Sequence, residues 1–370
     1  MDQNDILEVL RRVQHPETGT DLVSQGMIEN LIVTGDKIQF TLAFSRSRDP
    51  FAASLKKACE TILSETFPQY AGHISDFIKE APPKKIEPKK PEPGSWTGGI
   101  KHIIAVSSAK GGVGKSTVTA NLAVALQRMG YRVGILDADI YGPSMPTMFG
   151  VEGYQPAGDE EEEGTPRIYP ALSMGVKVMS IGFFINPKDA LIWRGPMATN
   201  ALRQLTHQTD WGELDYFLID LPPGTSDIHL TVVQTLALTG AIVVSTPQAV
   251  ALADARKGIN MFTNDKVNVP ILGLVENMAW FTPAELPENK YYIFGKEGAK
   301  RLAEELKVPL LGQIPIVQSI CESGDKGTPV ALDENTVTGR AFLQLAAAVV
   351  RQVDRRNMEM APTRIVEVHK

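Results

Sequence analysis

The sequence predicts an α/β protein with a mostly parallel sheet covered by helices on both faces, preceded by a small α+β domain. Beyond residue 98, short apolar runs without polar alternation are separated by helical patterns, which is typical of strands buried on both faces of a parallel sheet. Before residue 81, alternating runs and amphipathic helical patterns form a separate group. Five prolines and four lysines in residues 81–98 predict an extended linker between the two.

Length and composition support this division and exclude several classes. The 370 residues are 43% apolar and 22% charged, which suits a soluble globular protein of two domains. A net charge of −6 argues against broad nucleic-acid binding, so no nucleic-acid partner is expected. The start, MDQNDILEVL, lacks the basic and apolar regions of a signal peptide. Ile228–Ala253, the longest stretch without charge, is interrupted by Gly240 and Pro247 and predicts helix, turn and strand rather than a membrane span.

The cysteine content favours a reducing compartment. The chain has two cysteines, Cys59 and Cys321, which lie far apart in the sequence. A disulfide framework is therefore not expected, and the predicted location is cytoplasmic. Cys59 falls on an apolar helical stripe and is expected to lie in a core.

The first domain, residues 1–80, is predicted to be a small α+β unit. Its apolar patterns predict helix Asp5–Val13, a hairpin of Met27–Thr34 and Lys37–Phe44, helix Phe51–Phe67 and a short strand near Ile74–Ile78.

The second domain is predicted to span residues 99–356, with a tail at 357–370. Its clearest strands are His102–Ser107, Arg132–Asp137, Tyr216–Asp220, Ala241–Thr246, Ile271–Glu276 and Leu310–Ile314. Helices between them include Lys115–Met129, Ala249–Phe262 and Lys296–Leu306. The acidic run Asp159–Glu163 is expected to be a solvated surface loop.

The strongest functional signal is a glycine-rich loop between the first strand and the first helix of the second domain. It contains Lys110, Gly111, Gly112, Val113, Gly114, Lys115, Ser116 and Thr117. Glycines allow backbone N–H groups to converge on phosphate, and this strand–loop–helix context is that of a P-loop for ATP. We expect Lys115 to reach the β- and γ-phosphates, Ser116 to bind Mg²⁺ and Thr117 to contact the α-phosphate.

Two acidic motifs follow neighbouring predicted strands. Asp220 ends a strand before a Pro-Pro-Gly turn and fits a carboxylate that holds Mg²⁺ through water, and the Gly224 N–H is expected to face the γ-phosphate. Asp137 is a candidate for a metal-bound water and Asp139 for orienting the attacking water. The alternative role for Asp137 and for Asp139 is that of a helix cap. All three belong at the carboxyl ends of parallel strands, where ligands bind.

These motifs resemble a known family. The extra lysine of Lys110-Gly-Gly-Val-Gly-Lys-Ser resembles the deviant Walker A motif of the MinD/ParA class. Four further segments are similar to the Mrp/ApbC family of iron–sulfur cluster carrier ATPases: 137–144, 193–197, 220–225 and 275–278. The resemblance covers residues 100–350, and the first 80 residues resemble a small domain found in iron–sulfur assembly factors, with His15 where Asp is usual.

The resemblance implies a homodimer with two ATP molecules at its interface, in which Lys110 reaches the nucleotide of the facing protomer. The alternative interpretation of Lys110 is a solvated surface lysine. It also implies Asn277 and Pro315 as adenine contacts, and slow hydrolysis coupled to delivery of a [4Fe–4S] cluster to apoproteins. The family's C-x-x-C pair is absent from residues 279–292, so no cluster ligands can be assigned.

Two other functions remain as alternatives. The first is a nucleotide-switched scaffold that carries no cluster. The second is a positioning ATPase like MinD or ParA, which would call for a basic amphipathic helix at the C-terminus, where this chain has Pro362 and acidic residues.

Overall fold

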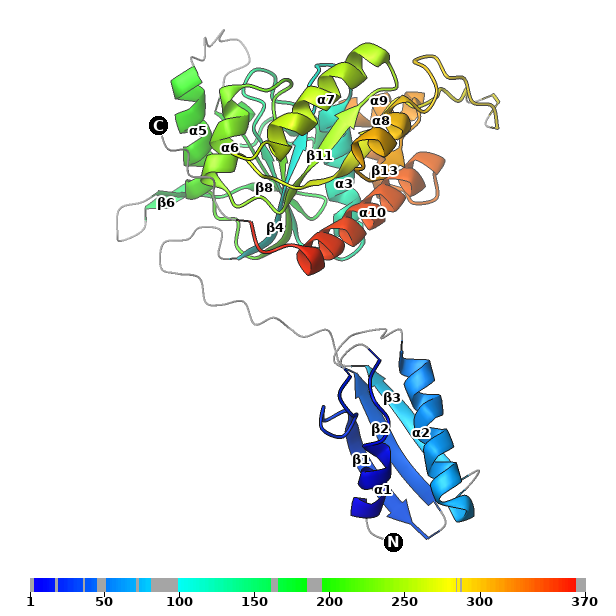
Figure 1. Cartoon of the computed structure of the whole chain (residues 1–370). Helices are drawn as coiled ribbons and strands as arrows, with labels where there is room; N and C mark the ends of the chain where they lie inside the picture. The colour runs from blue at the N-terminus through cyan, green and yellow to red at the C-terminus, as the bar shows by residue number, and fades with distance from the viewer. Residues whose placement is uncertain are drawn as a thin grey trace. The chain divides into compact units, whose positions relative to one another are not determined.

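The computed structural model describes two compact units, Met1–Lys90 and Pro91–Lys370 (Figure 1). The described residues are 3–16, 19–35, 37–44, 51–70, 73–80, 99–160, 166–184, 195–283, 285–286 and 288–363. The predicted linker 81–98 lies outside them, so the domain boundaries given above stay predictions.

The first unit is a three-stranded sheet with two helices. Its elements are α1 (Gln3–Leu10), β1 (Ile28–Thr34), β2 (Lys37–Phe44), α2 (Ala52–Thr66), the 3₁₀ turn η1 (Pro68–Tyr70) and β3 (Ile74–Glu80). β1 and β2 are antiparallel, and β3 lies parallel to β2. Alternate residues of β2 from Ile38 to Phe44 are buried in a core that also holds Cys59. The predicted elements are therefore confirmed, except that the first helix ends at Leu10 and not at Val13.

The second unit is built on an eight-stranded sheet with the order β13-β12-β11-β4-β10-β5-β9-β8. All neighbours are parallel except β8 and β9. The strands are β4 (Ile100–Ser107), β5 (Val133–Asp137), β8 (Ala171–Ser173), β9 (Val176–Ser180), β10 (Leu214–Asp220), β11 (Gly240–Ser245), β12 (Ile271–Glu276) and β13 (Leu310–Gln313). All six predicted strands are present, and β8 and β9 are additions to the prediction.

Helices cover both faces of this sheet, as predicted (Figure 1). One face packs against α3 (Lys115–Arg128), the short α4 (Met145–Met148) and α10 (Val337–Glu359). The other packs against α5 (Gly195–Gln208), α6 (Asp227–Thr235), α7 (Ala249–Thr263) and α8 (Gly298–Leu306). The remaining elements are α9 (Gln318–Asp325) and the 3₁₀ turns η2 (Ile181–Phe183) and η3 (Val330–Leu332).

One local prediction needs correction. Asp159 and Glu160 do not lie in a loop but in β6 (Gly158–Glu160), because their backbone pairs antiparallel with β7 (Pro166–Ile168). Residues 161–163 of the same acidic run lie outside the described part of the chain.

In the described part of the chain, no helix combines the length and the apolar character needed to cross a membrane.

Candidate functional site: a nucleotide pocket at the carboxyl edge of the sheet

The glycine-rich loop joins β4 to α3 and encloses a small pocket. Gly112 and Gly114 have φ of 78° and 79°, a left-handed conformation that favours glycine. At Gly114 a Cβ atom would also clash with the Asn277 side-chain amide, which adds to the strain that the positive φ imposes on any other residue. The pocket has a volume of about 260 Å³, and its lining residues are Ser108, residues 111–117, Asp139, Gly142, Ser144, Met148 and Pro223.

Asp220 lies beneath this loop and gathers three side chains from α3. Its Oδ2 accepts hydrogen bonds from Lys115 Nζ at 2.6 Å and Ser116 Oγ at 2.7 Å. Its Oδ1 accepts one from Thr119 Oγ1 at 2.7 Å. The Asp220 side chain is fully buried and that of Lys115 nearly so. A buried ion pair therefore joins the start of α3 to the end of β10.

Asp137 lies beside Asp220 because the two residues are register partners at the ends of β5 and β10. Its Oδ2 accepts hydrogen bonds from Ser180 Oγ at 3.0 Å and from the N–H groups of Ser144 and Met145 at 3.1 Å. Burial, together with the charge of Asp220, raises the pKa of Asp137 above its usual range. The pair of carboxylates thus forms an oxygen-rich site that suits a hard divalent cation.

Asp139 and Gly224 lie at the rim of the same site. Asp139 lines the loop pocket, and burial raises the pKa of its carboxyl group. The Gly224 N–H donates to the Ser108 carbonyl at 2.8 Å. The expected contact of Gly224 with a γ-phosphate would therefore require this hydrogen bond to break.

A second, larger pocket continues from the first and is suited to a nucleoside. Its volume is about 670 Å³, and it shares Gly114, Thr117, Ser144 and Met148 with the loop pocket. Asn277 and Pro315, the expected adenine contacts, both line it. Asn277 Nδ2 also donates to the Val113 carbonyl at 2.8 Å, so this side chain supports the loop as well. Cys321 lines the same pocket from α9.

Lys110 lies in the glycine-rich loop, directly before Gly111 of the loop pocket. It is half-buried and is not among the residues that line either pocket. The lining of the two pockets therefore does not place Lys110 at the nucleotide site of its own subunit.

The loop after β12, where the family resemblance implies cysteines, forms a braced hairpin of aromatic residues. Phe281 and Tyr291 exchange backbone hydrogen bonds at 2.8 and 2.9 Å. Lys290 Nζ lies 4.1 Å from the centre of the Trp280 ring. The loop's base is held by the buried Glu276, whose Oε1 accepts from Gln313 Nε2 at 2.7 Å and whose Oε2 accepts from the Ala299 N–H. The cysteines of this chain lie elsewhere: Cys59 in the first unit's core and Cys321 on α9.

Sequence reasoning missed three residues that hold this site together: Thr119, Ser180 and Glu276, all described above. A buried histidine also lies next to the site. His229 is buried on α6, with Nε2 3.5 Å from Ser107 Oγ and Nδ1 3.4 Å from Ser226 Oγ. The position of Thr119, one helical turn after Lys115, was a usable signal; Ser180 lies on β9, which was not predicted.

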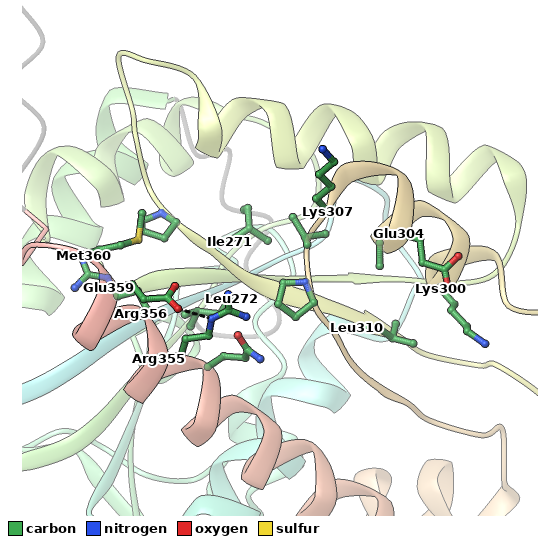
Figure 2. Close-up of a pocket in the computed structure, with 15 residues that line it drawn as sticks. Ile271, Leu272, Lys300, Glu304, Lys307, Leu310, Arg355, Arg356, Glu359 and Met360 are labelled. Carbon is green, nitrogen blue, oxygen red and sulfur yellow. Dashed lines mark hydrogen bonds and ion pairs between the residues drawn. The ribbon is translucent and has the colours of Figure 1, made fainter. Parts of the chain in front are cut away.

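A pocket of about 600 Å³ at the opposite edge of the sheet holds none of the predicted site residues (Figure 2). Ile271 and Leu310, at the amino ends of β12 and β13, contribute to its floor. Arg355 beside it pairs with Glu359 at 2.8 Å. Because ligands of parallel sheets bind at the carboxyl ends of strands, we do not assign the nucleotide to this pocket.

Comparison with known proteins agrees with the geometry. Residues 99–350 match the family model described as NUBPL iron-transfer P-loop NTPase. The chain belongs to this family. Residues 3–71 match a second model, described as iron–sulfur cluster assembly protein, so the resemblance found for both domains is confirmed.

Individual relatives extend over most of the chain. The iron–sulfur cluster carrier protein of Synechocystis is 41% identical over 94% of this chain and 97% of its own length. The protein of the same name from Escherichia coli is 49% identical over 69% of this chain and 68% of its own length. A solved structure of a nucleotide-binding protein from Archaeoglobus fulgidus, in complex with ADP, is 41% identical with a TM-score of 0.54, covering 62% of this chain and 88% of that one.

The burial of His229 predicts a pH-dependent contribution to stability. Burial lowers the pKa of His229 to about 4, so between pH 6.5 and 4 the unfolded chain binds a proton that the folded chain excludes. The stabilisation is present above pH 6.5 and is lost as the pH falls, by about 2 kcal/mol between pH 7 and pH 5. Relative to the wild type, His229→Gln should lose less stability over this interval. Urea unfolding followed by tryptophan fluorescence is selective, because all four tryptophans follow residue 90. Parallel pH curves for the two proteins would contradict the prediction.

Proposed function

We propose that this chain binds Mg·ATP at the carboxyl edge of its sheet, hydrolyses it slowly and uses it in iron–sulfur cluster assembly or transfer to apoproteins. The observation that carries the proposal is the cluster of Lys115, Ser116 and Asp220 under a glycine-rich loop. The family membership supports the iron–sulfur context. The two free cysteines suit the cytoplasm as the proposed compartment.

The residues present fit a magnesium nucleotide. A side chain at Gly114 would meet Asn277, and residues 111–117 line a pocket of about 260 Å³ at the start of α3, where backbone N–H groups suit phosphate. Ser116, Asp137 and Asp220 offer the oxygen atoms that Mg²⁺ prefers. When bound, Mg²⁺ would neutralise charge on the β- and γ-phosphates.

The proposed roles of the chain's own groups follow from their places. Lys115 would hold the β- and γ-phosphates and Thr117 the α-phosphate, both at the start of α3. Asp139, which lines the loop pocket, would orient the attacking water. Asn277 and Pro315 would contact the adenine, since both line the larger pocket next to the loop.

Lys115→Ala should abolish ATP hydrolysis, because no other cation takes its place on Asp220 in the described part of the site. Steady-state phosphate release measures the effect. Lys257→Ala is the matched control, since Lys257 is exposed on α7 and pairs only with Asp254 among the ion pairs of the described residues. Normal turnover in Lys115→Ala would refute the assignment of the site.

The active form is proposed to be a homodimer with nucleotide between facing protomers. Lys110 lines neither pocket of its own chain, which supports a role toward the nucleotide of the second copy. Exposed apolar side chains surround the same edge, among them Tyr141 and Val250. If Lys110 instead served the site of its own chain, its role in hydrolysis would not require a second copy.

Lys110→Ala should therefore lower hydrolysis while ATP binding to the monomer stays within about twofold of the wild type. Mixing this variant with Lys115→Ala is the sharper test. Because each variant lacks a different lysine, mixed dimers regain one complete site, and activity should return above that of either protein alone. Lack of recovery at concentrations where light scattering shows dimers would contradict the trans arrangement.

The cluster is proposed as cargo whose ligands come mainly from partner proteins. A [4Fe–4S] cluster is held by four thiolates, but each chain has one exposed cysteine, Cys321, and one buried in a core, Cys59. Among the described residues, no three His, Cys, Asp or Glu side chains form a metal site. The donor set thus does not fit a dimer-bridging [4Fe–4S] cluster of four thiolates. This favours one alternative, a scaffold that works on clusters held by assembly factors or apoproteins.

Anaerobic purification and reconstitution with iron and sulfide should yield far less than four iron atoms per dimer. Iron and sulfide assays with visible spectra measure this, and Cys321→Ser should leave the spectrum unchanged, with Cys59→Ser as the matched control. About four iron atoms per dimer, lost on replacing Cys321, would show that the chain carries its own cluster and overturn the cargo proposal.

A further inference from the structure

The carboxylate of Asp220 accepts hydrogen bonds from three side chains among the described residues. In the proposed function, two of these side chains bind the ligand instead. Lys115 and Ser116 both donate to Oδ2, and both are assigned to phosphate or Mg²⁺. Thr119 donates to the other oxygen, Oδ1, at 2.7 Å. It is completely buried and lines neither of the two pockets described above, so the proposed function gives it no direct contact with the nucleotide.

The Thr119 hydroxyl lies between two acceptors. It is one helical turn after Lys115 on α3, and its Oγ1 is 2.7 Å from Asp220 Oδ1 and 3.0 Å from the Lys115 carbonyl oxygen. A hydroxyl has a single hydrogen to donate, and the shorter contact, to a charged oxygen, is the stronger one. The hydroxyl therefore ties Asp220 Oδ1 to the helix that carries Ser116.

We propose that Thr119 is a positioning residue for the magnesium site: its hydroxyl holds Asp220 Oδ1 so that Oδ2 stays directed at the cation position beside Ser116. The inference rests on the proposed function, because it deepens the role of the same site. Without the hydroxyl, a fully buried carboxylate oxygen loses its partner and the side chain can rotate away from Ser116.

The test separates the magnesium-dependent part of ATP affinity from binding as such. A fluorescent ATP, methylanthraniloyl-ATP, is titrated into the full chain in EDTA and over a series of Mg²⁺ concentrations. The quantity compared is the dissociation constant in EDTA divided by that at saturating Mg²⁺. For Thr119→Val, this ratio should fall about tenfold or more, as for the loss of a hydrogen bond to a charged group, while affinity in EDTA stays unchanged. Thr119→Ser, which keeps the hydroxyl, should restore the ratio.

Thr206→Val is the matched control. Thr206 is also a buried helical threonine, and its Oγ1 donates to the carbonyl four residues before it, Leu202, at 2.6 Å, but it contacts no carboxylate in the described structure. Its ratio should equal that of the wild type. If Thr119→Val fails to fold, as judged by its thermal midpoint, Thr119→Ala takes its place with the same expected result.

The outcomes distinguish this inference from the proposed function. A wild-type protein whose ATP affinity is absent, or unaffected by Mg²⁺, would refute the proposed function itself. A wild type that responds to Mg²⁺ beside a Thr119→Val variant with the same ratio would overturn only the role of Thr119. Equal losses with and without Mg²⁺ would also overturn it, since they indicate general damage to the loop.

Discussion

The structure depends on one buried carboxylate at the carboxyl end of the sheet. Asp220 is fully enclosed and Lys115 is 5% exposed, so neither charge is stabilised by water. An isolated charge in such a place costs several kcal/mol, and removing one partner leaves the other uncompensated. The ion pair therefore costs free energy if its only role is structural. It does allow one counter-charge of Asp220 to replace another: when Lys115 moves to phosphate, a cation beside Ser116 can compensate the same carboxylate. We interpret the pair as a counter-charge for Asp220 that a bound ligand replaces.

The geometry of parallel strands brings this site together from distant segments. Asp220 is the register partner of Asp137 on one side and of Val106 on the other, and the glycine-rich loop leaves β4 directly after Ser107. Because parallel strands end at the same edge, three motifs that are spread over residues 110–225 converge without any long-range signal in the sequence. For this reason the pattern of apolar runs predicted the fold, and the glycine-rich and acidic motifs could be placed together at one edge of the sheet.

What could not be predicted depends on contacts made by unremarkable residues. β8 and β9 were not predicted, and with them Ser180 was missed as a partner of Asp137. Thr119 and His229 lie in helical segments where a buried polar residue is indistinguishable from a core position until its partner is known. Asn277 was expected to face a ligand, and only the structure showed that its amide also supports Val113 of the loop.

The loop after β12 shows how a family's framework and its cargo chemistry can separate. Ile316 lines the larger pocket, and its N–H donates to the Trp280 carbonyl at 2.7 Å, so one residue belongs both to the nucleotide pocket and to the base of the hairpin. The hairpin itself carries aromatic rings and lysines where thiolates would be needed to hold iron. The loop thus stays joined to the larger pocket through Ile316, but the described residues of this loop include no cysteine. A nucleotide-dependent change at Ile316 would reach a surface suited to contact protein, not metal, and this is why the cargo is better assigned to the partner than to this chain.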